Sequence, residues 1–272
     1  MKNKLLITIL VLIGFGSLVL SSCKKDKISS ARTSTYALKV KDQLGISGSI
    51  TFTETSASIT TIEIALSGGS SQNHAAQIRL NSMVERGFTS ITLNPVVGGN
   101  STTIVTALDN NTSVNYSQLI LFDGYLNIDE SSSNTLVKVA QCDIGGNALT
   151  TFKTTYNLNA VGVSGVSGTA VFERRNNGYT LVSIALNGTL NSGTHPAAIH
   201  IGSVATVGGG PITKSLNDVD GTTGTSYTNI RALDDATPIT YDNLMAYDGY
   251  LAIHESAILM TSIICQGNIG AH

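Results

Sequence analysis

The sequence of 272 residues contains no tryptophan, only four prolines and three cysteines, and only 12% of its residues are charged. Three cysteines are too few for a disulfide framework of the kind that holds small secreted domains together. The net charge is −2 and the sequence has no basic stripe, which argues against nucleic acid as a partner. The low charge, together with abundant Ser, Thr, Asn and Gly, is typical of a β-protein that works outside the cytoplasm.

The motifs of several common enzyme classes are also missing. The sequence has no Gly-x-Ser-x-Gly elbow, no phosphate-binding glycine-rich loop and no His-Glu-x-x-His helix. Residues 208–211, Gly-Gly-Gly-Pro, fall in a variable loop, where they are expected to bend the chain. We therefore expect a protein that is not an enzyme.

The N-terminus carries the longest apolar run. Lys2 and Lys4 precede a mostly apolar run over residues 5–20, which fits a signal peptide and is short for a membrane-spanning helix. Residues 20–23, Leu-Ser-Ser-Cys, resemble the lipobox of bacterial lipoproteins. That resemblance implies a signal peptide over residues 1–22 and a lipid on the sulfur of Cys23. The alternative is an ordinary signal peptide that happens to contain a cysteine.

A polar tether is predicted next, over residues 23–34, because this stretch has no apolar periodicity. Several acyl chains on one residue hold a protein firmly on a membrane, so the membrane is the first expected partner. We expect a cell-envelope location at the outer membrane, on its periplasmic or its surface face. The stretch resembles the surface-export signals of Bacteroidetes-type lipoproteins, but it is basic where those signals are acid-rich, so the leaflet stays open.

The remainder of the chain is a tandem repeat, which is the strongest organisational signal in the sequence. The longest match pairs residues 121–131 with 246–256, an offset of 125 residues, and the offset is 120 near the start of each copy. Small loop insertions account for that drift. We predict two domains, residues 35–148 and 149–272, each long enough to bury one core.

The sequence pattern of each copy predicts an all-β domain. Residues 59–66 and 180–186 alternate apolar and polar side chains and are rich in β-branched residues, as strands with one buried face are. Turn residues separate such segments, and helical periodicity is absent beyond the N-terminus. The pattern predicts two tandem antiparallel Greek-key β-sandwich or barrel domains behind the signal peptide.

Two smaller features repeat between the copies. Residues 116–119 and 241–244 are each predicted to form a short helical turn. The dipeptides at residues 123–124 and 248–249, both Asp-Gly, are predicted to be turns that precede strands.

Three strand motifs resemble the CHRD domain, a module named after chordin that also occurs in bacterial envelope proteins. In copy two, residues 197–202 match its histidine strand, residues 250–254 its Tyr-x-Asn-x-His strand and residues 264–269 its closing strand. Copy one matches the last two at residues 125–129 and 140–144. The resemblance covers nearly the whole mature chain twice and implies the same fold in both copies.

The chain departs from that pattern at Ala198, where the family has a histidine, and at Gln266, where it has an arginine. A more distant resemblance links the chain to copper–zinc superoxide dismutase, another Greek-key barrel. Residues 253–255, Ile-His-Glu, and 265–270, Cys-Gln-Gly-Asn-Ile-Gly, are similar to two of its strands. This second resemblance concerns topology, because the chain has too few histidines for that enzyme's two metals.

Positions that differ between the copies are the candidate functional sites. Copy two has His200 and His254 where copy one has Arg79 and Asp129. If the two strands are neighbours, Arg79 and Asp129 are predicted to form a charge-assisted structural pair. The two imidazoles could then bind Zn²⁺ or Cu²⁺, joined by His195 if it lies off the strand. The alternative is a pair of hydrogen-bonded histidines without metal.

The sequence thus supports two hypotheses about function. The first is a non-enzymatic lipoprotein without a cofactor, whose two CHRD-like domains bind an envelope protein or a polysaccharide or act as a structural module. The second is a zinc- or copper-binding or redox protein centred on the histidines of copy two. His74 and His195, present in both copies, are expected to bond to backbone. Cys142 and Cys265 could pair, although buried free thiols are favoured.

Overall fold

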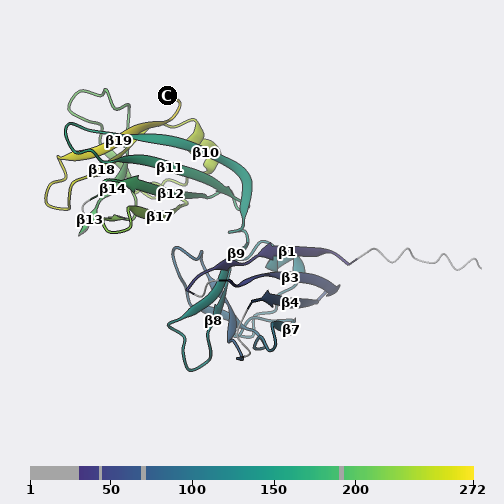
Figure 1. Cartoon of the computed structure of the whole chain (residues 1–272). Helices are drawn as coiled ribbons and strands as arrows, with labels where there is room; N and C mark the ends of the chain where they lie inside the picture. Colours follow the sequence, from purple (N-terminus) through teal and green to yellow (C-terminus); the bar gives the residue numbers. More distant parts are fainter. Residues whose placement is uncertain (1–30, 43–44, 69–71, 190–192) are drawn as a thin grey trace, which may run out of the picture. The chain divides into compact units, whose positions relative to one another are not determined.

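The computed structural model describes residues 31–42, 45–68, 72–189 and 193–272 (Figure 1). The signal peptide predicted over residues 1–22 and the lipidated Cys23 lie outside the described residues. The first strand already begins at Thr33, so the predicted tether ends slightly earlier than expected. Within the described ranges, no helix is both long and apolar enough to span a membrane.

Repeat 1, residues 31–148, forms two antiparallel sheets, as the alternating sequence pattern predicts. In spatial order, the first consists of β1 (Thr33–Ala37), β3 (Ser47–Ser56), β4 (Ile59–Ser67) and β7 (Asn100–Val105). The second consists of β2 (Lys39–Val40), β9 (Lys138–Gly145), β8 (Asp123–Asp129), β5 (Ala76–Leu80) and β6 (Thr89–Thr92).

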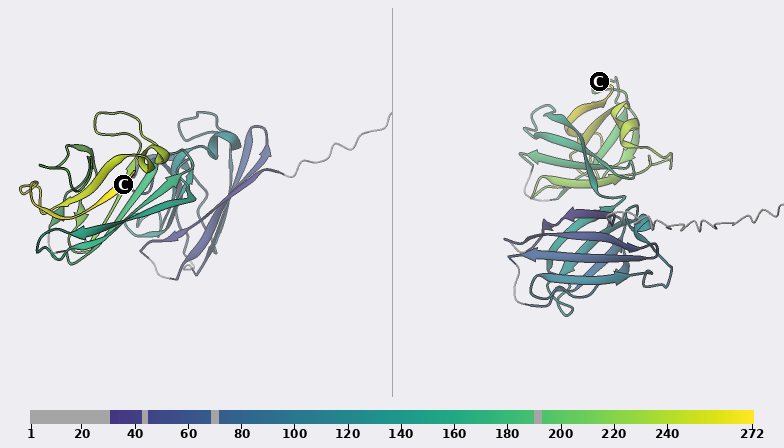
Figure 2. Two further views of the ribbon diagram at one scale, coloured as in Figure 1. Left: turned by 90° about the horizontal axis from the view of Figure 1, so that it is seen from above. Right: turned by 90° about the vertical axis from the view of Figure 1, so that its right-hand side faces the viewer.

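Repeat 2, residues 149–272, places the equivalent strands in one curled antiparallel sheet (Figure 2). β10 joins its two parts because it pairs with β11 along most of its length and with β19 at Asn159 and Ala160. In repeat 1 the corresponding stretch is divided at Leu38 into β1 and β2, which leaves two sheets. The spatial order is β13 (Thr194–His195), β16 (Val219–Asp220), β17 (Thr225–Ile230), β12 (Thr180–Asn187), β11 (Ser167–Arg175), β10 (Leu149–Ala160), β19 (Ile263–Gly270), β18 (Asp248–His254), β14 (Ala197–Ile201) and β15 (Ile212–Ser215).

Each repeat has its own hydrophobic core, and the two cores are built alike. Phe52 and Phe172 occupy equivalent inward positions of β3 and β11 and are fully buried. Tyr36 meets the Phe52 ring edge-on, with centroids 5.7 Å apart, and Tyr156 meets Phe172 in the same way at 5.2 Å. The duplication therefore extends from the sequence to the packing of the cores, and the predicted all-β, antiparallel class is confirmed.

Both predicted helical turns are confirmed, as α1 (Tyr116–Leu119) and α2 (Tyr241–Met245). Asn115 and Thr240 are their N-caps, and each accepts a hydrogen bond from a backbone N–H in the first turn. The third helical residue bonds back to the cap in both cases, which completes a capping box. These bonds satisfy donors that so short a helix would otherwise leave free.

The predicted Asp-Gly turns are wrong, because Asp123 and Asp248 are the first residues of β8 and β18. Glycine is needed at the next position for space. A Cβ on Gly124 would lie 2.6 Å from the Phe122 ring and 2.8 Å from the carbonyl oxygen of Arg79. Close approach between neighbouring strands therefore accounts for this glycine, and the sequence pattern of a turn is misleading here.

Cys142 and Cys265 are both free and buried, each in the core of its own repeat. The expectation of buried free thiols is confirmed. Burial raises the pKa of both thiols, that of Cys265 to about 12, so neither is a reactive thiolate at neutral pH.

Candidate functional site

The candidate site lies on the face of repeat 2 that points away from the hydrophobic core. Residues alternate along β18, so that Leu251 and Ile253 enter the core while Tyr250 and His254 lie on the opposite face. Tyr250 and His254 are nevertheless only 2% exposed, and His200 on the neighbouring strand β14 is 6% exposed. The face is therefore a second buried layer rather than open surface.

The structure brings His200 and His254 together. β14 pairs with β18 so that His200 lies opposite Tyr250, and His254 lies four residues further along β18. Ala198 and Ala252 form the cross-strand pair in between, and their small side chains leave room for the imidazoles to lean toward each other. The two Nε2 atoms are 3.4 Å apart and the ring centroids 5.5 Å apart.

The surroundings of His200 determine its tautomer. Its Nδ1 lies 2.7 Å from the carbonyl oxygen of Gly210, which can only accept a hydrogen bond, so Nδ1 carries the proton. In the neutral ring Nε2 then has a lone pair, and this lone pair faces His254. The ring also stacks on Tyr250 at 4.8 Å, and the Tyr250 hydroxyl accepts a hydrogen bond from the Gly210 N–H. These contacts fix the orientation of the imidazole.

Fewer contacts orient the His254 ring than the His200 ring. Its Nδ1 is buried and makes no hydrogen bond of ordinary geometry. Burial lowers the pKa of His254, and the nearby His200 lowers it further, whereas the backbone of Met260 favours the protonated form. His254 is therefore expected to be neutral at pH 7.

The lowered pKa of His254 predicts a loss of stability in acid. The unfolded chain takes up a proton near the ordinary histidine pKa of about 6.5, whereas the folded chain resists protonation until a lower pH. The free energy of unfolding should be highest above the unfolded-state pKa of about 6.5. It should fall as the pH drops from there toward the lower, folded-state pKa. Urea denaturation between pH 8 and pH 5 should show a shallower fall for His254→Gln. His272→Gln, at an exposed position, is the control, and equal pH dependence in all three proteins would contradict the prediction.

In repeat 1 the equivalent face is filled by a hydrogen-bonded network. Asp129, only 1% exposed, accepts bonds from Lys138 at 2.5 Å, Gln77 at 3.0 Å and Asn127 at 2.8 Å. Gln141 in turn donates to Asn127 at 2.7 Å. Gln77 and Asn127 occupy the cross-strand pair that is alanine in repeat 2. The two repeats thus share a fold and differ in the chemistry of this face.

The predicted pair of Arg79 and Asp129 is wrong. Arg79 lies opposite Tyr125, so Asp129 is four residues or roughly 13 Å further along β8, and the Gln77 side chain occupies the space between them. Arg79 donates instead to the carbonyl oxygen of Gly87 at 2.8 Å, and Asp129 pairs with Lys138. A β-bulge beside Asp129 sets its register with Lys138, and no local sequence pattern predicts this bulge.

His195 does not join the histidine pair. It belongs to β13, and its Nδ1 bonds the carbonyl oxygen of Glu255 at 2.9 Å. His74 makes the same bond to Glu130, also at 2.9 Å, which confirms the backbone-bonding role expected for both residues. Across the described part of the chain, no group of three or more His, Cys, Asp or Glu side chains is placed to hold a metal ion.

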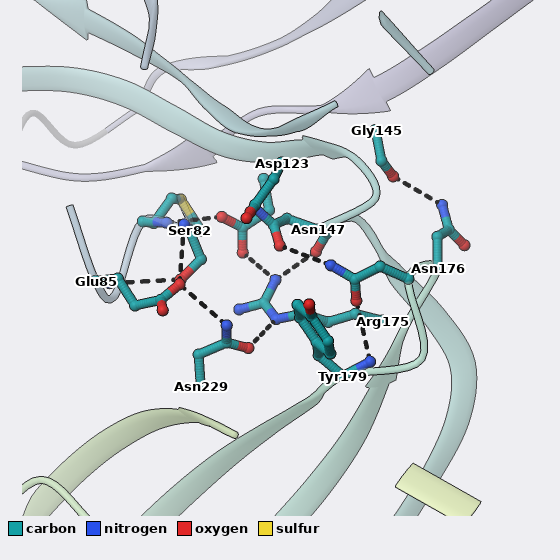
Figure 3. Close-up of polar contacts among 12 residues, drawn as sticks. Ser82, Glu85, Asp123, Gly145, Asn147, Arg175, Asn176, Tyr179 and Asn229 are labelled. Atoms are coloured by element: carbon teal, nitrogen blue, oxygen red, sulfur yellow. Dashed lines mark hydrogen bonds and ion pairs between the residues drawn. The ribbon is translucent and has the colours of Figure 1, made fainter. Parts of the chain in front are cut away.

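A second buried polar cluster, centred on Arg175 at the end of β11, connects residues of the two repeats (Figure 3). Its side chain is fully buried, and its guanidinium pairs with Asp143 at 2.6 Å and bonds the Asn147 carbonyl. Nε also donates to Asn229 at 2.8 Å. The aligned residue of repeat 1 is Thr55, so this difference between the copies could have identified the cluster from sequence.

Further contacts surround Arg175 on both sides. Asn229 donates to Glu85 at 3.0 Å, and Arg231 pairs with the same carboxylate. The backbone N–H of Met83 donates to Asp143 at 2.7 Å, so both oxygens of that carboxylate are bonded. The cluster neutralises a buried carboxylate and stabilises the contact between the repeats, a structural role.

The fold and these two clusters define an all-β protein with duplicated cores and one histidine-bearing face. No family model matches the chain, and searches of curated proteins and of solved structures find no significant similarity.

Proposed function

We propose that the chain is a non-enzymatic, lipid-anchored protein of the cell envelope, with two CHRD-like domains, that binds an uncharged polysaccharide. Support comes from the solvent-facing side of the sheet β1-β3-β4-β7, here called the hydroxyl face. Three cross-strand rows form this face, and Glu63 is the one charged residue in them. Its threonines are Thr33, Thr35, Thr51, Thr53, Thr61 and Thr102.

The chemistry of the hydroxyl face suits a sugar polymer. A threonine hydroxyl both donates and accepts hydrogen bonds, as sugar hydroxyls do. Neighbouring strands lie about 4.8 Å apart and alternate residues about 6.7 Å apart, so the hydroxyls form a regular array. Thr35 and Thr51 bond each other at 3.0 Å and keep further acceptor capacity. The near absence of charge disfavours an ionic partner.

The corresponding face of repeat 2 is a natural comparison. There Lys153 lies opposite Glu173, and Val171 lies opposite Thr155. Charged and apolar side chains thus replace hydroxyls at equivalent positions. The polysaccharide is therefore assigned to repeat 1.

The lipid anchor complements this assignment. The lipobox-like sequence at Cys23 would hold the protein at a membrane, with the polar stretch up to residue 32 between the lipid and β1. At the outer membrane, on either face, such a protein would meet envelope polysaccharides.

Thr35→Lys is expected to reduce polysaccharide binding strongly, because it places a long charged side chain in the middle row of the hydroxyl face, on the edge strand β1. Thr155→Lys is the matched control, since Thr155 is the equivalent exposed residue of repeat 2. Sedimentation with insoluble neutral polysaccharides such as cellulose, chitin and xylan measures the bound fraction. Wild type and Thr155→Lys should sediment with at least one polymer. No binding by wild type, or equal binding by both variants, would count against the proposal.

A further inference from the structure

We propose that His200 and His254 form a binding site for a tetrahedrally coordinated divalent metal ion, with Zn²⁺ as the expected occupant. The site goes beyond polysaccharide binding and uses a different face of a different repeat. Both imidazoles are buried, they face each other through Nε2, and backbone or ring contacts orient His200.

The separation of the two nitrogens supports tetrahedral geometry. Zn–N bonds are about 2.05 Å long, so two imidazole nitrogens on one tetrahedral ion lie about 3.3–3.4 Å apart. Adjacent ligands of a square-planar ion with the same bond length would lie about 2.9 Å apart. The observed distance between the Nε2 atoms is 3.4 Å, which is also longer than an ordinary hydrogen bond to nitrogen. The two nitrogens would therefore need little change in their separation to hold an ion.

The contacts of His200 match those of a metal ligand. Metal-binding histidines generally donate their second ring N–H to a carbonyl or a carboxylate, which fixes the tautomer and makes the ligand nitrogen more basic. Gly210 supplies that carbonyl to Nδ1 of His200, at 2.7 Å. The lone pair on Nε2 is consequently available toward His254.

The environment of His254 is compatible with the same role. In the pair without metal, the long contact to His200 requires His254 to donate from Nε2, which leaves its buried Nδ1 without a hydrogen. An unpaired buried nitrogen is unfavourable. Metal on Nε2 would place the proton on Nδ1 instead, because the coordinating nitrogen of a neutral imidazole carries no hydrogen.

The equivalent face of repeat 1 has different residues at the positions of this site. Gln77 and Asn127 stand there where repeat 2 has alanines, and Asp129 is bonded by Lys138. Two imidazoles supply only half of a tetrahedral shell, so water or an added ligand must complete it. An exchangeable ion is therefore expected, rather than one required for folding.

Isothermal titration with ZnCl₂ alone, in a non-chelating buffer at pH 7.5, tests the site in the purified full chain. One zinc ion per chain should bind to wild type, and His200→Gln and His254→Gln should each weaken binding on the order of tenfold or more. His272→Gln controls for a surface site, because His272 pairs with Asp248 on the exposed surface. Thr35→Lys should bind zinc normally, which separates this proposal from the one for polysaccharide.

Zinc-induced changes in the ring nitrogen resonances of wild type provide a second readout that needs no variant at the site. Shifts of His200 and His254, and not of His74 or His195, would support the site even if a variant at the pair folds poorly. The proposal is overturned if wild type binds no zinc, if His254→Gln binds as tightly as wild type, or if the shifts fall on other histidines.

Discussion

Replacing Arg175 by alanine should lower the free energy of unfolding by about 3–5 kcal/mol, because the Asp143 carboxylate would be left buried without its counter-charge. The Arg175 side chain is fully buried and that of Asp143 only 6% exposed, so solvent cannot replace the lost pair. Asn229 and the Asn147 carbonyl would lose their donor as well. Urea denaturation followed by circular dichroism measures the loss.

Arg174→Ala is the matched control for this prediction. The neighbouring Arg174 side chain is 35% exposed and reaches Asp242 only at 3.4 Å, so its loss should cost at most about 1 kcal/mol. The double variant Arg175→Met with Asp143→Leu should recover much of the stability, since removing both charges leaves none unpaired. Equal losses for Arg174→Ala and Arg175→Ala would contradict the assigned role of the buried cluster.

Truncation of the core phenylalanines should have a similarly large effect. Phe172→Ala and Phe52→Ala should each cost about 3–5 kcal/mol, through lost burial and the cavity that remains. Both rings are at most 1% exposed and both pack edge-on against a tyrosine, so the two costs should be alike. Differential scanning calorimetry of the full chain measures them.

Phe152→Ala separates core packing from a general effect of losing an aromatic ring. This ring is 60% exposed, so its removal should change stability by no more than about 0.5 kcal/mol. If Phe52→Ala were as mild as Phe152→Ala, the equivalence of the two cores would be wrong.

The strands and helices could be predicted from sequence because local signals and the duplication agree. Residues 59–66 and 180–186 alternate clearly, and they correspond to β4 and β12. Each short helix follows a polar residue whose side chain caps it, and it recurs at the equivalent place. A local pattern that occurs at the equivalent place in both copies predicts the same element twice, as the two short helices show.

The details of the sites depended on long-range register, which the sequence does not reveal. The meeting of His200 and His254 was predicted only on the condition that their strands are neighbours, and the role of the alanines between them was not predicted. The bulge that pairs Asp129 with Lys138 breaks the simple alternation of β8 and β9. Arg175 is the last residue of β11, and its partners lie more than 25 residues away in sequence, Asp143 and Asn147 in repeat 1 and Asn229 in repeat 2.

The most direct test of the central claim, that the histidine pair of repeat 2 binds a metal ion at the face where repeat 1 has a hydrogen-bonded network, is anomalous diffraction at the zinc edge from crystals grown with ZnCl₂. The account predicts a peak between the Nε2 atoms of His200 and His254, with none at the equivalent face of repeat 1. Zinc confined to the surface, for example at His272 and Asp248, with the histidine pair unchanged, would contradict it.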